Sequence, residues 1–318
     1  MLDLFHIPSN TENTKIFYAQ GATGWQTWEK PRNAKFIQIF CLGAGGSGGS
    51  GQRGVAGSAR AGGGGGGAGG VVRALYPAFL LPDVLYVQVG AGGAFVPPTV
   101  PGVTGNSGGI SYVSISPTTT AVSVIAQSSN AAAGGGAASI TTTTNAGGAA
   151  ATTWTTTTSP FTSVGILNIA AGIVGGVSTN ANTLAITNNQ ALGTNIVTGG
   201  AGGGSNNSVT AGSYSATAGG SIVSASVILV NSVLGGLTGT LIGAGNPGGH
   251  GYGSLSPFCG TGGAGGSGQA SGSFTAGTGG NGWYGCGGGG GGAGVALTST
   301  GGGGGKGGDG LVIITTII

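Results

Sequence analysis

Runs of apolar and β-branched residues, most of them bordered by glycine, set the pattern of this 318-residue chain. Their β-branched and aromatic content is typical of strands. No stretch places apolar residues at the spacing of an amphipathic helix. The pattern therefore predicts an all-β protein with essentially no α-helix, whose strands cover residues 34–42, 71–75, 84–89, 110–115, 164–169, 222–230 and 311–318.

Two of these runs, Phe36–Leu42 and Leu311–Ile318, are apolar at nearly every position rather than at alternate positions. Such runs are typical of strands that are covered on both faces. Both runs also border glycine tracts. We therefore expect both faces of these strands to be covered, and we expect the two strands to lie in one sheet.

Glycine makes up 79 of the 318 residues and gathers in long tracts at 43–70, 199–204, 243–253, 260–294 and 301–310. Disordered chains are rich in charge and poor in apolar residues, whereas this one is 39% hydrophobic and 4% charged. Extended polyproline-II helices have no internal hydrogen bonds, so buried tracts must pair with one another. We expect packed polyglycine-II helices, with β-sandwich-like strands joined by the glycine-rich tracts.

Charge is almost absent from most of the chain, because residues 84–305 contain no Asp, Glu, Lys or Arg. Acid–base catalysis, hard-metal binding and nucleic-acid binding all need such groups. Seven of the eight cations lie in the first 73 residues. The composition predicts no enzyme, no cofactor, no metal site and no nucleic-acid partner.

Two short motifs lack the context that their chemistry needs. Residues 43–48 fit the G-x-G-x-x-G pattern, but no helix-forming sequence or suitably spaced acidic residue follows. The three cysteines show no zinc-type spacing. Cys41 lies in a strand pattern and is interpreted as a core thiol, and the spacing leaves open whether Cys259 and Cys286 pair.

The first 33 residues differ from the rest, with little glycine and two tryptophans. Residues 1–10 lack the apolar core of a secretory signal, and no stretch is apolar enough for a transmembrane helix. We interpret residues 1–33 as an N-terminal arm or attachment segment, and residues 34–318 as a glycine-rich β/polyglycine-II domain with a Thr/Ala-rich lobe inserted at 117–198. The candidate residues for attachment to a particle are Trp25, Trp28, Lys30 and Arg32.

The order of the pieces carries a resemblance to a known family. Phe36-Ile37-Gln38-Ile39 leads into Gly43-Ala44-Gly45-Gly46, Val87-Gln88-Val89 leads into Gly90-Ala91-Gly92-Gly93, and Gly307-Gly308-Asp309-Gly310 leads into the last strand. Over roughly residues 25–116 and 199–318, the chain resembles the glycine-rich domain of bacteriophage tail-fibre and tip-adhesin proteins. The resemblance implies a virion protein with a polyglycine-II block and loops that contact the host surface.

We therefore expect a non-enzymatic structural virion protein on the surface of the extracellular particle, most simply a tail or head fibre or adhesin. The expected partners are other virion proteins, further copies of the chain, as in a trimer, and a host saccharide or outer-membrane protein, without membrane insertion. Aromatic rings bind such surfaces without charge. The candidate receptor contacts are Trp154, Tyr214, Tyr252, Phe258, Phe274, Trp283 and Tyr284.

Other interpretations stay open. Large aromatics mostly lie in protein interiors, so each candidate contact is alternatively a core or lattice residue. The chain is alternatively an architectural capsid decoration or joining protein without a receptor. An ice-binding or cell-wall glycine-rich protein is a third class, against which the threonine runs at 141–144 and 155–158 are contiguous rather than spaced by three.

Overall fold

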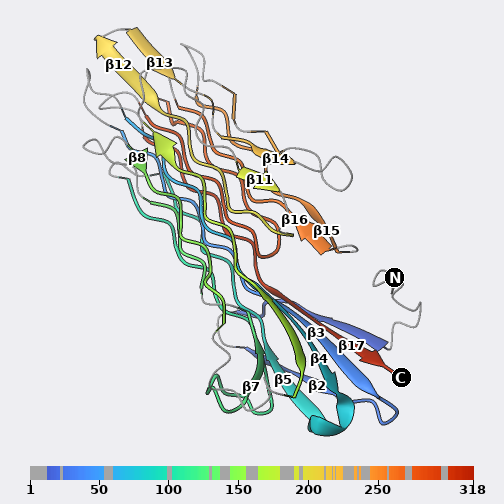
Figure 1. Ribbon diagram of the computed structural model, residues 1–318. Coiled ribbons are helices and arrows are strands. Elements are labelled where there is room, and N and C mark those ends of the chain that lie inside the picture. Colours follow the sequence, from blue (N-terminus) through green and yellow to red (C-terminus); the bar gives the residue numbers. More distant parts are fainter. Residues whose placement is uncertain are drawn as a thin grey trace.

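The chain forms an elongated body with two unlike parts (Figure 1), β-sheets at one end and bundled glycine tracts along the rest. The only helix with described bounds is the single-turn 3-10 helix η2 (Ala78–Leu80), which confirms the all-β prediction. No helix in the described part of the chain is long and apolar enough to cross a membrane. The computed structural model describes residues 13–21, 24–53, 60–98, 102–128, 131–136, 144–154, 164–179, 190–192, 196–210, 213–216, 218, 220–224, 233–234, 236–237, 244–255, 258–268, 274–294 and 300–318.

A five-stranded antiparallel sheet joins strands that are far apart in sequence. Its central pair aligns Leu311 with Leu42 and Ile317 with Phe36, which confirms that the two apolar runs lie in one sheet. The strand order is β1 (Thr14–Phe17), β17 (Leu311–Ile317), β3 (Phe36–Leu42), β4 (Val71–Pro77) and β9 (Ile166–Ala170).

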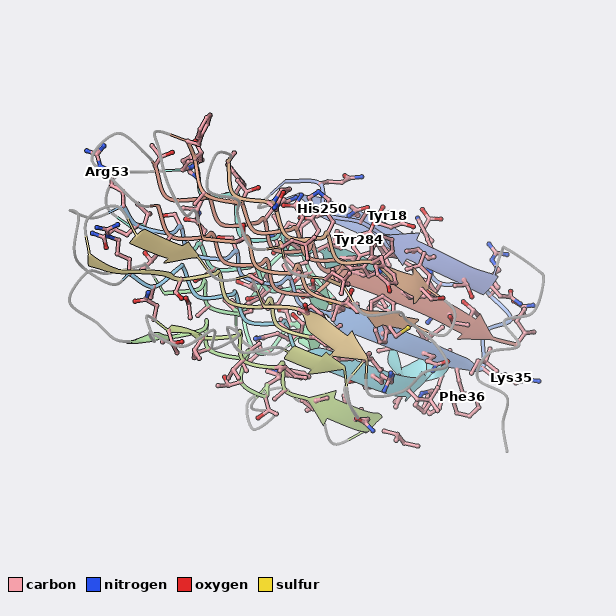
Figure 2. All side chains as sticks on the ribbon, turned by 90° about the horizontal axis from the view of Figure 1, so that it is seen from above. Tyr18, Lys35, Phe36, Arg53, His250 and Tyr284 are labelled. Atoms are coloured by element: carbon pink, nitrogen blue, oxygen red, sulfur yellow. The ribbon has the colours of Figure 1, made fainter. Side chains whose placement is uncertain are left out.

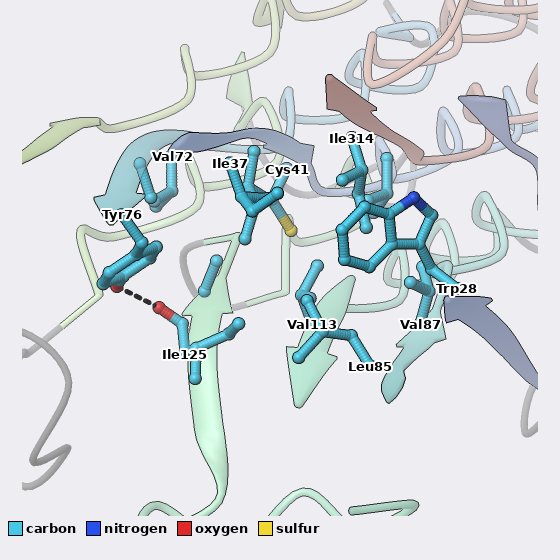
Figure 3. Packing of buried hydrophobic residues seen from close by; sticks show 14 of the residues in the cluster. Trp28, Ile37, Cys41, Val72, Tyr76, Leu85, Val87, Val113, Ile125 and Ile314 are labelled. Atoms are coloured by element: carbon cyan, nitrogen blue, oxygen red, sulfur yellow. Dashed lines mark hydrogen bonds between the residues drawn. The ribbon is translucent and has the colours of Figure 1, made fainter. Parts of the chain in front are cut away.

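A four-stranded antiparallel sheet lies against the first sheet, and the two form a β-sandwich with one shared core (Figure 3). Ile37 and Val72 from the first sheet meet Leu85 and Val113 from the second. The Tyr76 hydroxyl donates a hydrogen bond of 2.7 Å to the carbonyl of Ile125 across this core. The strand order is β2 (Trp25–Glu29), β5 (Val84–Gln88), β6 (Tyr112–Ser114) and β7 (Val124–Gln127).

The described part of residues 1–33 contributes strands to the sandwich. β1 pairs with β17, and β2 pairs with β5. Residues 14–17 and 25–29 are therefore edge strands, and their role in attachment stays a prediction.

Four two-stranded pairs lie outside the sandwich, and one of them contains a strand of the predicted run 222–230. The part of that run at 225–230 lies outside the described residues. The pairs are β8 (Thr144–Asn145) with β10 (Ser178–Thr179), β11 (Gln190–Leu192) with β14 (Ile222–Ser224), β12 (Asn206–Thr210) with β13 (Ser213–Ala216), and β15 (Gly253–Leu255) with β16 (Phe258–Gly260).

The expectation that both faces of β3 are covered is wrong for most of the strand. Ile37 and Ile39 point into the sandwich and are fully buried. On the opposite face, Phe36 is 43% exposed and Phe40 is only half-buried. The reason is that the glycine block covers this outer face only toward the end of the strand. Leu42 packs there in a second buried cluster, and Phe40 lies at the margin of that cluster, with its ring against Phe258.

The glycine tracts form a lattice that repeats every three residues, as polyproline-II geometry requires. Around the tract at 285–294, the backbone N–H groups point in turn to three neighbouring tracts. Three further tracts, at 63–69, 263–266 and 302–308, donate back to its carbonyls. The donated bonds run from 287, 290 and 293 to the carbonyls of 198, 201 and 204, from 288, 291 and 294 to those of 46, 49 and 52, and from 289 and 292 to those of 280 and 277.

Glycine is needed in this lattice because a side chain has no room. A Cβ built on Gly289 would press into the carbonyl of Ala264, and one on Gly64 into the carbonyl of Ala146, both well inside 3.0 Å. Only two glycines in the described ranges, Gly21 and Gly285, have positive φ. The tracts therefore use the small size of glycine rather than its freedom to adopt left-handed geometry.

Serine hydroxyls tie particular tracts together inside the lattice. Ser47 Oγ accepts a hydrogen bond of 2.7 Å from the backbone N–H of Asn106, and Ser50 Oγ accepts one of 2.8 Å from that of Val103. Both serines are fully buried. The two accepting serines are three positions apart, and so are the two donating residues. These bonds therefore follow the lattice repeat and help to align the two tracts.

Candidate functional site

The two tryptophans predicted to attach the chain to a particle lie on β2 but in different surroundings. Trp28 is 4% exposed and packs in the sandwich core (Figure 3). Trp25 is half-buried. A side chain as covered as Trp28 offers almost no surface to a partner, so its position favours the alternative role in the core.

Lys30 and Arg32, the other two attachment candidates, line a charged pocket of about 480 Å³ at the end of the sandwich. The Lys30 ammonium donates hydrogen bonds to the carbonyls of Ala78 (3.1 Å) and Leu81 (2.5 Å) and lies 3.3 Å from Asp83. Lys30 therefore holds the turn around η2 in place. Arg32 is exposed and accessible to a partner.

Several receptor-contact candidates lie at separate places. Trp154 is 9% exposed and belongs to the sandwich core, whereas Tyr252 is 36% exposed. Phe274 is 47% exposed, and Phe258 is half-buried near β3. Tyr214 lies on β13, and its side chain is outside the described residues.

Trp283 and Tyr284 pack where the glycine block meets the outer face of the sandwich. Their rings meet edge to face with centroids 5.1 Å apart, and Tyr284 also contacts the Tyr18 ring at 5.9 Å (Figure 2). Burial is the main cause that raises the pKa of Tyr284, and nearby Tyr18 and Asp309 add to it. The Trp283 indole N–H is buried without a hydrogen-bond partner among the described residues.

The cysteines are buried free thiols. Burial raises the pKa of Cys41 and of Cys286 to about 12, so both are protonated at neutral pH. A protonated buried thiol is a poor nucleophile and a poor metal ligand. In the ranges that the structure describes, no three His, Cys, Asp or Glu side chains gather to hold a metal ion.

A groove that the sequence patterns do not reveal lies where the first glycine tracts leave the four-stranded sheet. This junction groove has a volume of about 570 Å³ and is lined by Gln88, residues 90–92, residues 107–110, Tyr112, Thr119 and Ala131. Gln88 and Tyr112 are cross-strand neighbours on β5 and β6. In the sequence, Gln88 precedes one glycine tract and Tyr112 follows another. Only the pairing of the two strands brings them together.

The lining of the junction groove has no ionisable side chain apart from the Tyr112 phenol. Burial and the nearby Cys41 thiol raise the pKa of that phenol, so it is neutral at physiological pH. The groove thus offers hydrogen bonds and an aromatic ring, without the tuned acid and base that catalysis requires. The arrangement supports binding.

A family model described as a glycine-rich domain matches residues 20–316, which include the four-stranded sheet, the five-stranded sheet apart from β1 and the last residue of β17, and the tracts of the block. No curated protein matches the chain.

Proposed function

This chain belongs to the glycine-rich domain family, and on that premise we propose that it is a non-enzymatic structural protein of a virion. Its role is that of a phage tail or head fibre or adhesin that contacts the host surface. Its partners are other virion proteins, further copies of the chain, and a saccharide or outer-membrane protein of the host. It acts on the outer surface of the particle.

The observation that carries this proposal is the hydrogen-bonded glycine lattice. Each interior tract exchanges backbone hydrogen bonds with several others, as the tract at 285–294 does with six. Such a block is held mainly by backbone hydrogen bonds, and few charged groups take part in its described portion, namely the buried Arg60, which donates to the carbonyl of Gly294, and the ion pair between Lys306 and Asp309. An elongated body with few charges, held by a continuous hydrogen-bonded lattice, suits a fibre, which must present a surface at a fixed distance from its anchor.

The distribution of charge and aromatic rings supports the same proposal. Arg32 and Lys35 are exposed. Lys35 lies at the sandwich end (Figure 2), where contacts with other virion proteins are proposed. The block exposes neutral aromatic groups such as Tyr252 and Phe274, and its cations at the surface are few, such as Arg53 and Lys306. Neutral aromatic and hydroxyl groups suit contacts with saccharides and protein surfaces.

The test has two parts. First, electron microscopy of particles labelled with an antibody against this chain places it on the virion, and we expect label on a tail or head appendage. Second, the purified chain is added to host cells before infection, and we expect it to bind the cells and reduce adsorption of the phage. Absence of the chain from purified particles would refute the proposal.

The alternative is an architectural decoration or joining protein without a receptor. It is favoured by one observation, namely that Trp154, a predicted receptor contact, lies in the core. Under this alternative, the chain is found on the particle but neither binds cells nor competes with the phage. Sedimentation of the purified chain measures whether it forms the proposed homo-oligomer.

A further inference from the structure

The junction groove is an open groove whose volume is that of a small-molecule site. Its volume of about 570 Å³ falls within the range of about 300–1,000 Å³ that such sites occupy. Gln88 and Tyr112 come from adjacent strands of one sheet, so a rigid scaffold sets their spacing. Ser107 and Thr119 add exposed hydroxyl groups.

Backbone groups along the groove are available for a ligand because the lattice ends there. Gly109 N–H donates 2.8 Å to the carbonyl of Ala91, and Gly92 N–H donates 2.8 Å to Asp309 Oδ1. In contrast, the N–H groups of Ala91 and Ile110 have no hydrogen-bond partner within the described part of the chain. Among the described residues, no further tract accepts these two bonds on this side.

The ligand should carry no charge, because the groove has no charged side chain to pair with one. It must form hydrogen bonds with these backbone and hydroxyl groups. A neutral saccharide does so, because its hydroxyls both donate and accept hydrogen bonds and its C–H face is apolar. The half-buried Tyr112 combines an apolar ring with a polar hydroxyl in the same way. We propose that the junction groove binds a neutral saccharide, with Tyr112 as the platform for the sugar ring and with Gln88, Ser107 and Thr119 as hydrogen-bonding neighbours.

None of the residues that line this site is among the receptor-contact candidates. It deepens the proposed adhesive function by naming a ligand class, and it rests on that function only for its biological purpose. Binding to the groove is a property of the purified chain, so it is tested without cells or particles.

The experiment is saturation-transfer difference NMR on the full purified chain. The probes are glucose, galactose, N-acetylglucosamine and their β-linked disaccharides, each added alone. We expect saturation transfer to the ring C–H protons of at least one probe. Tyr112→Ala should weaken the affinity for that probe about tenfold, which corresponds to about 1.4 kcal/mol.

Two further variants keep the result independent of folding. Ser107→Ala and Thr119→Val change exposed side chains and should weaken binding without a change in melting temperature. Tyr86→Ala is the matched control, since Tyr86 lies on β5 two residues before Gln88 but does not line the groove. It should bind like the parent.

Absence of saturation transfer from every probe would overturn the proposal, as would binding that survives in Tyr112→Ala, Ser107→Ala and Thr119→Val alike. The cell-adsorption test is separate. A chain that binds a saccharide in the groove but does not bind cells would refute the adhesive function and leave the site. A chain that binds no probe, and that adsorbs to cells equally well with and without the Tyr112 side chain, would refute the saccharide site and leave the adhesive function.

Discussion

At the scale of single residues, the most constrained positions are those where no atom can be added. Gly289 and Gly64 lie in tracts whose neighbours already occupy the space of a Cβ. Their replacement separates hydrogen-bonded backbones, and each buried amide that loses its partner costs about 1–3 kcal/mol. This type of constraint is invisible in side-chain contacts, because the residue has no side chain.

We expect Gly289→Val and Gly64→Val to lower the melting temperature strongly or to abolish folding. The control is Ala131→Val, which enlarges an exposed side chain at the start of the tract at 131–136. It should melt like the parent. Thermal unfolding followed by circular dichroism measures all three, and parent-like melting of both glycine variants would mean that the tracts are loops.

The indole N–H of Trp283 lowers the stability of the fold. Its indole N–H is buried and has no partner among the described residues, which costs about 1–3 kcal/mol. Trp283→Phe removes that donor and keeps most of the apolar ring. We expect it to cost less than about 1.5 kcal/mol in denaturant unfolding, whereas Trp283→Ala removes the ring and costs more. Equal losses for the two variants would show that the donor is satisfied.

At the scale of the strand, β3 has one covered face and one that is partly open. Ile39 is fully buried in the sandwich, while Phe36 on the opposite face is 43% exposed. We expect Ile39→Ala to lower the free energy of unfolding by about 2–5 kcal/mol, as large-to-small changes in cores do. Phe36→Ala should cost clearly less although it removes more atoms. A larger loss for Phe36→Ala would indicate that another layer covers this face in solution.

The direct antiparallel pairing of the two apolar runs does not follow from the sequence. The strands and the presence of these runs in one sheet do follow, because β-branched runs bordered by glycine have few other solutions. The lattice follows as well, since uncharged glycine tracts must pair when they are buried. The junction groove and the role of Lys30 do not follow. The groove depends on which strands become neighbours, and the role of Lys30 depends on the carbonyls of a turn. Neither feature produces a recognisable pattern in the sequence. Continuous apolarity also overstated the cover on β3, because it cannot distinguish a second layer from an open face.

At the scale of the whole molecule, pH acts mainly through buried neutral acids. Burial raises the pKa of Cys41 and Cys286 from 9.0 to about 12, and it also raises that of Tyr76. Below pH 9 these groups stay protonated in both the folded and the unfolded state, so their contribution to stability is fully present. Above pH 9 the unfolded chain releases protons that the folded chain keeps, so stability falls as pH rises.

We therefore expect the free energy of unfolding to decline from about pH 9 to pH 12. Each of these groups contributes up to about 1.4 kcal/mol per pH unit once its unfolded form ionises. Denaturant unfolding at a series of pH values measures the slope. Cys41→Ala should reduce the slope, and an unchanged slope in that variant would show that Cys41 ionises equally in both states.

The serines that tie tracts together have a consequence for how the chain reaches its fold. In a lattice of identical residues, a tract displaced by three positions finds the same backbone partners, so slipped alignments compete closely with the native one. In the native alignment, the buried hydroxyls of Ser47 and Ser50 both accept backbone N–H groups, from Asn106 and Val103. A displacement by three residues brings only one of the two serines opposite one of these donors. These two hydroxyls therefore favour the native alignment of the tracts over displaced ones during folding, even though they add little to the stability of the finished block.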